Sequence, residues 1–139
     1  MKIETVFIDT SFFVARFNTQ DKNHPKAQEF LHRVRTAQEP FLFLTTDYIF
    51  DETITTLLYQ TQNHAITAEC GHAILTSKIS LKHIDAQLFR KTWQFYLDRP
   101  DKLWSFTDCS SFLLMEITGS KKSLTFDRNF KHAGFAMLP

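Results

Sequence analysis

Four acidic residues in this chain stand where strand and helix ends would bring carboxylates together: Asp9, Glu52, Asp108 and Asp127. Asp9 and Asp127 each end a short apolar run, Asp108 opens an apolar stretch typical of a helix, and Glu52 lies early in another. A carboxylate at the end of a buried strand is poorly solvated and needs a partner. A divalent cation would be the natural partner, because hard cations take oxygen ligands.

Each acid also has a simpler interpretation. Asp9 could cap the following helix, and Asp108 could serve the first turn of its helix, where an acid contributes about 0.3–1 kcal/mol. Asp127 could be a turn residue paired with Arg128, and Asp51 could be the solvated acid beside Glu52. The four positions therefore carry weight as a set and little weight singly.

Length and composition predict one domain over residues 1–139, because 139 residues suit a single compact core. Cys70 and Cys109 do not form a disulfide framework, which favours a reduced, cytoplasmic location. No apolar run approaches the ~18–20 residues needed to span a bilayer, so no membrane association is expected. The N-terminal segment lacks the apolar core of a signal peptide.

Charge is distributed unevenly, although the net charge is only +1. Residues 36–77 contain no Lys or Arg and five acids, whereas residues 78–139 contain ten Lys or Arg and six acids. An anionic polymer approaching an acidic pocket across a basic rim would suit this layout. An uneven distribution of charge that arose by chance is an equally good explanation. The basic residues beside the Asp127 segment are candidates for contacts with the phosphates of such an anionic polymer: Lys121, Lys122, Arg128 and Lys131.

Apolar periodicity alternates between strand and helix along the chain. Strands are predicted over 3–8, 41–44, 79–84, 123–126 and 135–138. Helices are predicted over 10–17, from Pro25 to before Pro40, from Thr45 or Thr46 to about Gln62, over 65–77, after Asp85, over 108–118 with Thr107 as its cap, and over a short turn at 128–132.

This alternation predicts a three-layer α/β/α sandwich around a mainly parallel five-stranded sheet. Sites in such sheets form beyond the carboxyl ends of the strands, where Asp9 and Asp127 would lie. The helix after Asp85 is expected to bury its aromatic side chains in the core, with a partner surface as the alternative: Phe89, Trp93, Phe95 and Tyr96.

Together these segments resemble the PIN-domain family, and the resemblance spans nearly the whole chain. Four runs carry it: Phe7-Ile8-Asp9-Thr10-Ser11, Thr45-Thr46-Asp47-Tyr48-Ile49-Phe50-Asp51-Glu52-Thr53, Ser105-Phe106-Thr107-Asp108-Cys109 and Leu124-Thr125-Phe126-Asp127-Arg128-Asn129-Phe130. The closing segments Ala133-Gly134-Phe135 and Leu138-Pro139 are also similar to the end of that family.

The resemblance implies a PIN-like fold and a metal-dependent endoribonuclease. Single-domain bacterial members are often VapC-type toxins of type II toxin-antitoxin pairs, held inactive by a cognate antitoxin, and dimers are common. The four acids would surround Mg²⁺ or Mn²⁺, with Asp9 and Asp108 as the foremost direct ligands. Thr10, Ser11 and Thr107 would orient them or a water. Many members carry an acid or a histidine where this chain has Asn129, a difference that bears on a second metal and not on the four acids.

Three alternative functions stay open from the sequence. The first is a catalytically inactive PIN-like module that only binds RNA or a protein, and the second is a nuclease acting on DNA. The third is a phospho-accepting receiver domain, which needs paired acids near the first strand and a Lys after the fifth. The chain offers Asp9 alone at the first position, and no Lys follows residue 132.

Overall fold

The computed structural model describes residues 3–37 and 40–139. Its five strands are β1 (Glu4–Ile8), β2 (Phe41–Thr46), β3 (Ser80–Lys82), β4 (Lys122–Leu124) and β5 (Ala136–Leu138). Its helices are α1 (Thr10–Phe17), α2 (His24–Ala37), α3 (Asp47–Thr61), α4 (His64–Thr76), α5 (Ala86–Leu97), α6 (Phe106–Thr118) and α7 (Asn129–His132). Among the described residues, no helix is long and apolar enough to cross a membrane.

The strands form one parallel sheet in the order β3-β2-β1-β4-β5. The central strand β1 buries Val6, Phe7 and Ile8 in succession, because helices cover both faces of a parallel sheet. The chain leaves β1 toward β2 on one side and returns to β4 on the other. This reversal of strand order makes a crevice at the carboxyl ends of β1 and β4.

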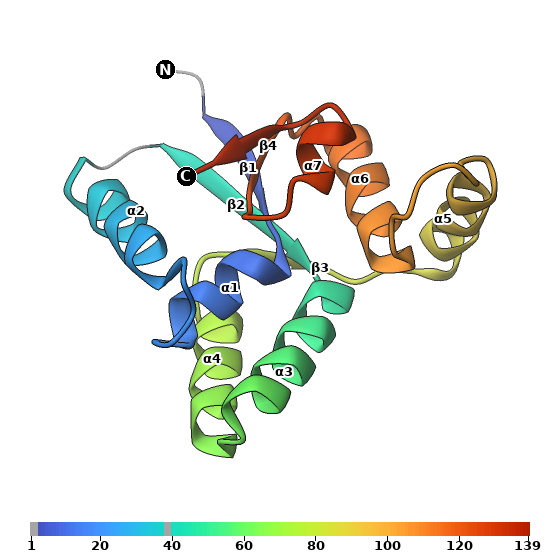
Figure 1. Cartoon of the computed structure of the whole chain (residues 1–139). Helices are drawn as coiled ribbons and strands as arrows, with labels where there is room; N and C mark the ends of the chain where they lie inside the picture. Colours follow the sequence, from blue (N-terminus) through green and yellow to red (C-terminus); the bar gives the residue numbers. More distant parts are fainter. Residues whose placement is uncertain (1–2, 38–39) are drawn as a thin grey trace.

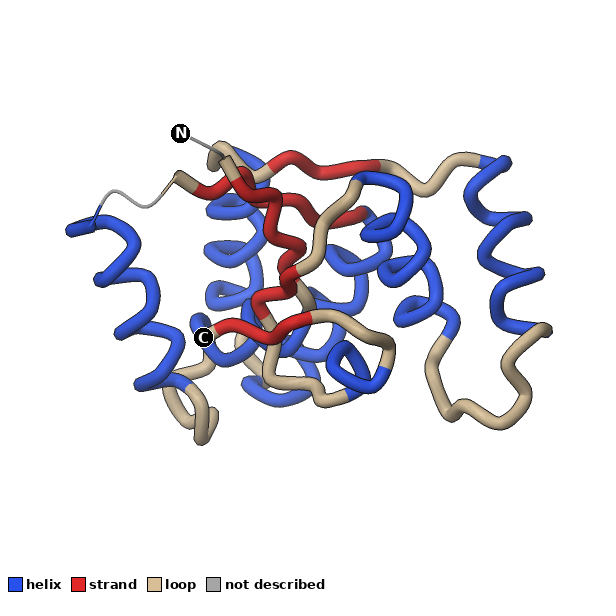
Figure 2. Tube along the Cα trace, turned by 90° about the horizontal axis from the view of Figure 1, so that it is seen from above, coloured by secondary structure: helices blue, strands red, loops and turns tan. Residues whose placement is uncertain are grey.

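Helices α1 to α4 gather on one side of the strands and α5 and α6 on the other, as Figure 1 shows, while the view from above in Figure 2 shows the strands running between them. Val6 pairs with Phe43 and Phe7 with Leu44, so alternate residues of β1 and β2 face opposite layers. The predicted three-layer parallel sandwich is confirmed.

Aromatic rings fill both layers of the core. On the α2 side, the Phe30 ring lies 6.5 Å from Phe41 and 6.0 Å from Phe12. On the α6 side, Phe112 meets Phe130 edge to face at 4.9 Å, and Phe130 also lies 6.2 Å from Phe7. Because Phe130 is fully buried, it fastens the short helix α7, and with it the Asp127 segment, to the sheet.

Several boundaries differ from the predicted ones at segments that begin or end with polar residues. Helix α6 begins at Phe106 with Ser105 as its N-cap, so the prediction of Thr107 as the cap is wrong. The Ser105 hydroxyl accepts from the Asp108 amide at 2.9 Å while Asp108 Oδ2 accepts from the Ser105 amide at 3.2 Å. This capping box outcompetes Thr107 because it satisfies two free amides at once. Strand β4 ends at Leu124 rather than residue 126.

The aromatic residues of α5 are mostly not in the core. Phe95 is buried, but Phe89, Trp93 and Tyr96 are 48%, 50% and 41% exposed. The buried side of α5 is instead formed by Leu88, Thr92 and Phe95, with the Thr92 hydroxyl donating to the Leu88 carbonyl at 2.7 Å. Burial of all four aromatic residues was therefore a wrong prediction.

Replacing Phe130 by alanine should lower the free energy of unfolding by about 3–5 kcal/mol, the usual cost of a buried Phe-to-Ala cavity. Chemical denaturation monitored by circular dichroism measures this change. The neighbouring variant Lys131→Ala, at an exposed position of the same helix, should shift stability by no more than ~0.5 kcal/mol. Equal effects of the two variants would contradict the anchoring role of Phe130.

Candidate active site

The four acids predicted from the sequence line one pocket at the carboxyl ends of β1 and β4. Its volume is about 370 Å³, and Asp9, Glu52, Asp108 and Asp127 all border it. They arrive from the end of β1, from α3, from the first turn of α6 and from the loop before α7. No Lys or Arg belongs to the described lining, so the carboxylates share the pocket without a basic side chain.

Asp9 is the most deeply placed of these acids, with 4% of its surface exposed. Its Oδ2 atom accepts hydrogen bonds from the hydroxyls of Ser11 at 2.9 Å and Thr125 at 2.8 Å. The Ser11 amide adds a longer contact at 3.4 Å that caps α1. Both interpretations of Asp9 therefore hold together, because it caps a helix and borders the pocket.

Asp108 and Glu52 are held by different contacts. Asp108 Oδ2 takes part in the capping box with Ser105 and also receives the side-chain amide of Asn129 at 3.4 Å. Glu52 Oε1 accepts the hydroxyl of Thr10, which joins α3 to the start of α1. Asn129 therefore donates to one of the site carboxylates.

Asp127 is set by the loop that follows β4. Its backbone amide donates to the Thr125 hydroxyl oxygen at 2.9 Å, and its Oδ1 atom accepts the Asn129 amide at 2.9 Å. The ion pairs of the described residues do not include a pairing with Arg128, the simpler interpretation that the sequence left open. Asp127 is therefore oriented by backbone turns and not by a neighbouring cation.

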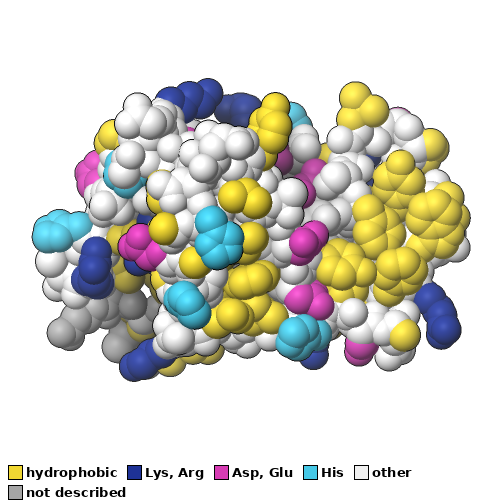
Figure 3. All heavy atoms as spheres, turned by 90° about the horizontal axis from the view of Figure 1, so that it is seen from below, with side chains coloured by type: hydrophobic (Ala, Val, Ile, Leu, Met, Phe, Trp, Pro, Cys, Tyr) yellow, Lys and Arg dark blue, Asp and Glu magenta, His cyan; other side chains and the backbone are white. Residues whose placement is uncertain are grey.

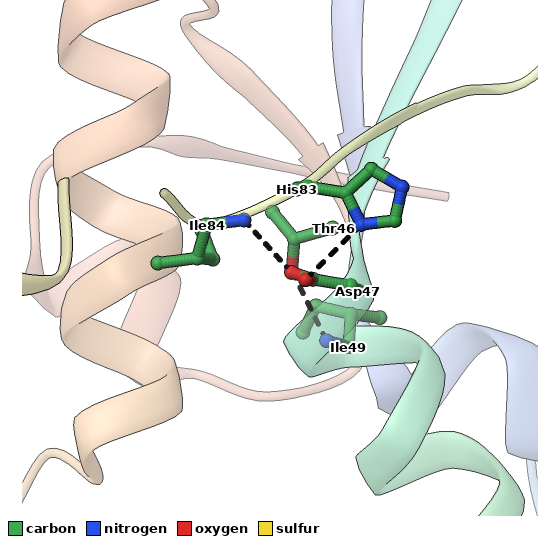
Figure 4. Close-up of polar contacts among 5 residues, drawn as sticks. All are labelled: Thr46, Asp47, Ile49, His83 and Ile84. Atoms are coloured by element: carbon green, nitrogen blue, oxygen red, sulfur yellow. Dashed lines mark hydrogen bonds and ion pairs between the residues drawn. The ribbon is translucent and has the colours of Figure 1, made fainter. Parts of the chain in front are cut away.

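The other acids at the start of α3 have separate roles. Figure 4 shows Asp47 turned toward the segment after β3, where its carboxylate accepts the Ile84 amide at 3.0 Å and contacts His83 Nδ1 at 3.2 Å. Thr46, beside it, caps α3 by accepting the Ile49 amide at 3.0 Å. Asp51 is exposed. Of the three acids in this segment, only Glu52 borders the acidic pocket.

Burial and mutual repulsion disfavour the ionised form of two acids. Desolvation raises the pKa of Asp9 from 3.8 to about 6, the hydroxyls of Thr125 and Ser11 oppose this shift, and the charge of Asp108 adds to it. Burial likewise raises the pKa of Asp108, with further increases from Asp127 and Glu52. The acids are thus close enough to repel one another, which creates a demand for positive charge.

The donor set fits a hard divalent cation, since it consists of carboxylate oxygens without a basic partner. Within residues 3–37 and 40–139, no three acidic, histidine or cysteine side chains stand close enough together to form a ready-made cation site. Mg²⁺ does not require such a cage, because it keeps several waters and binds through one or two protein carboxylates.

Two of the three expected supporting residues contact the acids directly. The Thr10 hydroxyl donates a hydrogen bond to Glu52 and the Ser11 hydroxyl donates one to Asp9, whereas Thr107 borders an adjacent pocket. Thr125 and Asp21 were missed. Thr125 was assigned to an apolar strand although it bonds Asp9. Asp21 also lines the acidic pocket but comes from a polar loop that no periodicity marks.

The four basic residues predicted for RNA contact divide into two pairs. Arg128 and Lys131 are exposed in and beside α7, close in sequence to Asp127. Lys121 and Lys122 lie at the opposite end of β4 from the pocket, and Lys122 forms an ion pair with Glu4 at 2.9 Å. The structure therefore does not bring Lys121 and Lys122 to the acidic site.

The fold and the site together define a class of α/β protein, in which carboxylates gather beyond the ends of β1 and β4 in a parallel three-layer sandwich. Known protein families and structures of the same class match this chain. The PIN domain model matches residues 6–136, so the chain belongs to the PIN-domain family. The chain is 28% identical over 130 residues to the 23S rRNA-specific endonuclease VapC20 of Mycobacterium tuberculosis, covering 94% of this chain and 95% of that one.

Solved structures give the same result for the fold. The crystal structure of Mycobacterium tuberculosis VapC20, described as a sarcin-ricin loop cleaving toxin, matches with a TM-score of 0.82 at 27% identity over 97% of each chain. VapBC2 from Rickettsia felis, bound to a promoter DNA fragment, matches with a TM-score of 0.66 at 9% identity over 96% of this chain and 97% of that one, a likeness of fold alone. The receiver-domain alternative is wrong, because such sheets run 2-1-3-4-5 and this one does not.

Without metal, Asp9→Asn should stabilise the protein at neutral pH. The raised pKa of Asp9 means that the folded state binds its proton more tightly, so stability falls as pH rises from about 3.8 to about 6. An amide at this position removes that loss, which amounts to ~3 kcal/mol. Thermal unfolding in chelator between pH 4 and 8 should show the advantage of Asp9→Asn growing through this window and then levelling. The exposed variant Asp101→Asn is the control, and a pH-independent difference between Asp9→Asn and parent would contradict the assignment.

Proposed function

We propose that this protein is a metal-dependent endoribonuclease of the VapC type that uses Mg²⁺ or Mn²⁺ to cleave RNA. The observation that carries the proposal is the gathering of four carboxylates, from segments up to 118 residues apart in numbering, in one pocket whose described lining has no basic residue. The relatedness over 94% of the chain to a 23S rRNA-specific endonuclease supports RNA, and 23S rRNA first, as the substrate.

Asp9 and Asp108 are the groups that would hold the cation, with Glu52 and Asp127 completing the charge around it. When bound, such an ion supplies Lewis acidity for hydrolysis of a phosphodiester bond. Ser11 and Thr125 keep the Asp9 carboxylate in a fixed orientation by donating to Oδ2, and Thr10 does the same for Glu52. Fixed ligand orientation matters because supporting hydrogen bonds tune metal affinity.

The same proposal includes protein partners, namely a cognate antitoxin that holds the enzyme inactive and a second copy of the chain in a homodimer. VapBC2, one of the matched structures, is a complex bound to promoter DNA. Exposed apolar side chains on α3 and α4, including Leu58 and Leu75, offer surface for such contacts.

Asp108→Asn should abolish RNA cleavage while leaving the fold intact, because the neutral amide keeps the shape of the capping group and removes one negative ligand. The assay follows purified 23S rRNA and an RNA oligonucleotide by gel with Mg²⁺, with Mn²⁺ and with chelator. Parent and Asp101→Asn should cut only when metal is present. Cleavage by Asp108→Asn at the parental rate, or undiminished cleavage in chelator, would refute the proposed chemistry. A DNA strand of the same sequence tests the alternative substrate.

Thr125→Val tests the support of Asp9. The substitution keeps the volume of the side chain but removes the hydroxyl that donates to Asp9 and accepts from the Asp127 amide. The Mg²⁺ concentration needed for half-maximal cleavage should rise by about 10- to 100-fold. Thr92→Val removes an equally buried hydroxyl that serves only a helix carbonyl in α5, and it should leave that concentration unchanged. Similar Mg²⁺ curves for the two variants would contradict the role assigned to Thr125.

A further inference from the structure

A second pocket adjoins the acidic one and shares two of its lining residues. Its volume is about 430 Å³, and Glu52 and Thr56 border both cavities. The rest of its lining comes from α3 and from the first turn of α6: Tyr48, Asp51, Thr55, Phe106 and Thr107. This volume falls within the range of roughly 300–1,000 Å³ found for small-molecule sites.

Two aromatic rings form the apolar part of this pocket, and neither belongs to the buried core cluster. The rings of Tyr48 and Phe106 lie 6.2 Å apart at 37°, and Phe106 is backed by Phe89 at 5.3 Å. Tyr48 and Phe106 are both partly exposed, and Phe89 is 48% exposed. In Figure 3, hydrophobic side chains gather on the side of the molecule where α5 lies, with acidic side chains next to them.

The charge around this pocket disfavours a phosphate as its occupant. Asp51 and Glu52 border it, and no Lys or Arg is part of the described lining. Burial and the nearby Asp47 raise the pKa of Tyr48, so its phenol stays neutral. A flat, uncharged group with hydrogen-bonding edges fits these walls, because the rings offer π faces while the threonine hydroxyls and Asp51 offer polar contacts.

We propose that this pocket receives an unpaired nucleobase of the RNA substrate, stacked against Tyr48 and Phe106, while the neighbouring phosphodiester reaches the acidic pocket past Glu52. The proposal rests on the proposed ribonuclease function. Unpaired bases of RNA commonly stack on aromatic side chains, a contact worth about 1–3 kcal/mol per base in alanine substitutions. Glu52 and Thr56, shared by both cavities, make the base pocket continuous with the carboxylates.

The test compares ring-removing variants with matched controls in two assays. Tyr48→Ala and Phe106→Leu remove an aromatic face, Tyr48→Phe keeps the ring, and Tyr59→Ala removes an 80% exposed tyrosine from the far end of the same helix. Binding is followed in chelator by the fluorescence of 2-aminopurine placed in a single-stranded RNA. Cleavage is followed with Mg²⁺ on the same RNA and on a version with an abasic site at that position.

Base stacking should quench 2-aminopurine in the parent, in Tyr48→Phe and in Tyr59→Ala. Tyr48→Ala and Phe106→Leu should lose this quenching and show a KM about 5- to 150-fold higher with an unchanged kcat. The abasic RNA should raise the KM of the parent to the same level and have no further effect on Tyr48→Ala. If one variant fails to fold by circular dichroism, the other variant and the abasic RNA carry the same comparison.

Parental quenching and KM in both ring variants would overturn the base pocket while leaving the ribonuclease assignment intact. Loss of dimerisation in those variants by analytical ultracentrifugation, with RNA parameters unchanged, would assign the surface to a second copy of the chain and likewise overturn it. A parent that cuts no RNA with either metal would refute the ribonuclease function, while the quenching in chelator would still report whether a base binds here.

Discussion

Burial of the Asp9 carboxylate is the constraint on which the rest of the site depends. A carboxylate with 4% exposure at the end of the central strand incurs a large desolvation cost, and this cost raises its pKa. The fold offsets part of that cost with hydroxyl donors from Ser11 and Thr125, and leaves the remainder as a demand for positive charge. The described pocket lining has no Lys or Arg, so no basic side chain in it supplies this positive charge.

The same hydrogen bonds that support Asp9 also place Asp127. The Thr125 hydroxyl donates to Asp9 and accepts from the Asp127 amide, and the Ser11 hydroxyl accepts the Phe126 amide at 2.9 Å. A backbone bond from the Asp9 amide to Leu124 at 3.1 Å fixes the two strand ends against each other. One network therefore sets the positions of two carboxylates that are 118 residues apart in numbering, and it explains why the irregular chain after β4 holds a defined shape.

Most of this fold could be predicted from the sequence because its apolar runs are clear. The sequence could not decide which of two similar faces of a helix is buried. The continuous burial of β1 and the alternation of strands with helices follow from apolar runs. Helix α5 has two stripes of the same period, 88-92-95 and 89-93-96, and the aromatic residues of both were expected inside. Packing on α6 selects the stripe with the polar Thr92, whose hydroxyl is satisfied within its own helix. Thr125 was missed because a threonine in a predicted strand is usually explained by its high β propensity and not by a role in a site.

An acidic site repels a polyanionic substrate such as RNA. The positions of the basic and aromatic residues in this molecule bear on how such a substrate could approach the site. The carboxylates by themselves would repel phosphates, and Lys121 and Lys122 lie at the other end of β4, where Lys122 is paired with Glu4. Of the predicted basic contacts, Arg128 and Lys131 closely follow a residue of the site, Asp127, in sequence. An uncharged base held by Tyr48 and Phe106 would give the RNA a foothold that repulsion does not oppose. Recognition by base and cation together would then restrict cutting to unpaired segments, because a base within a helix cannot enter the pocket.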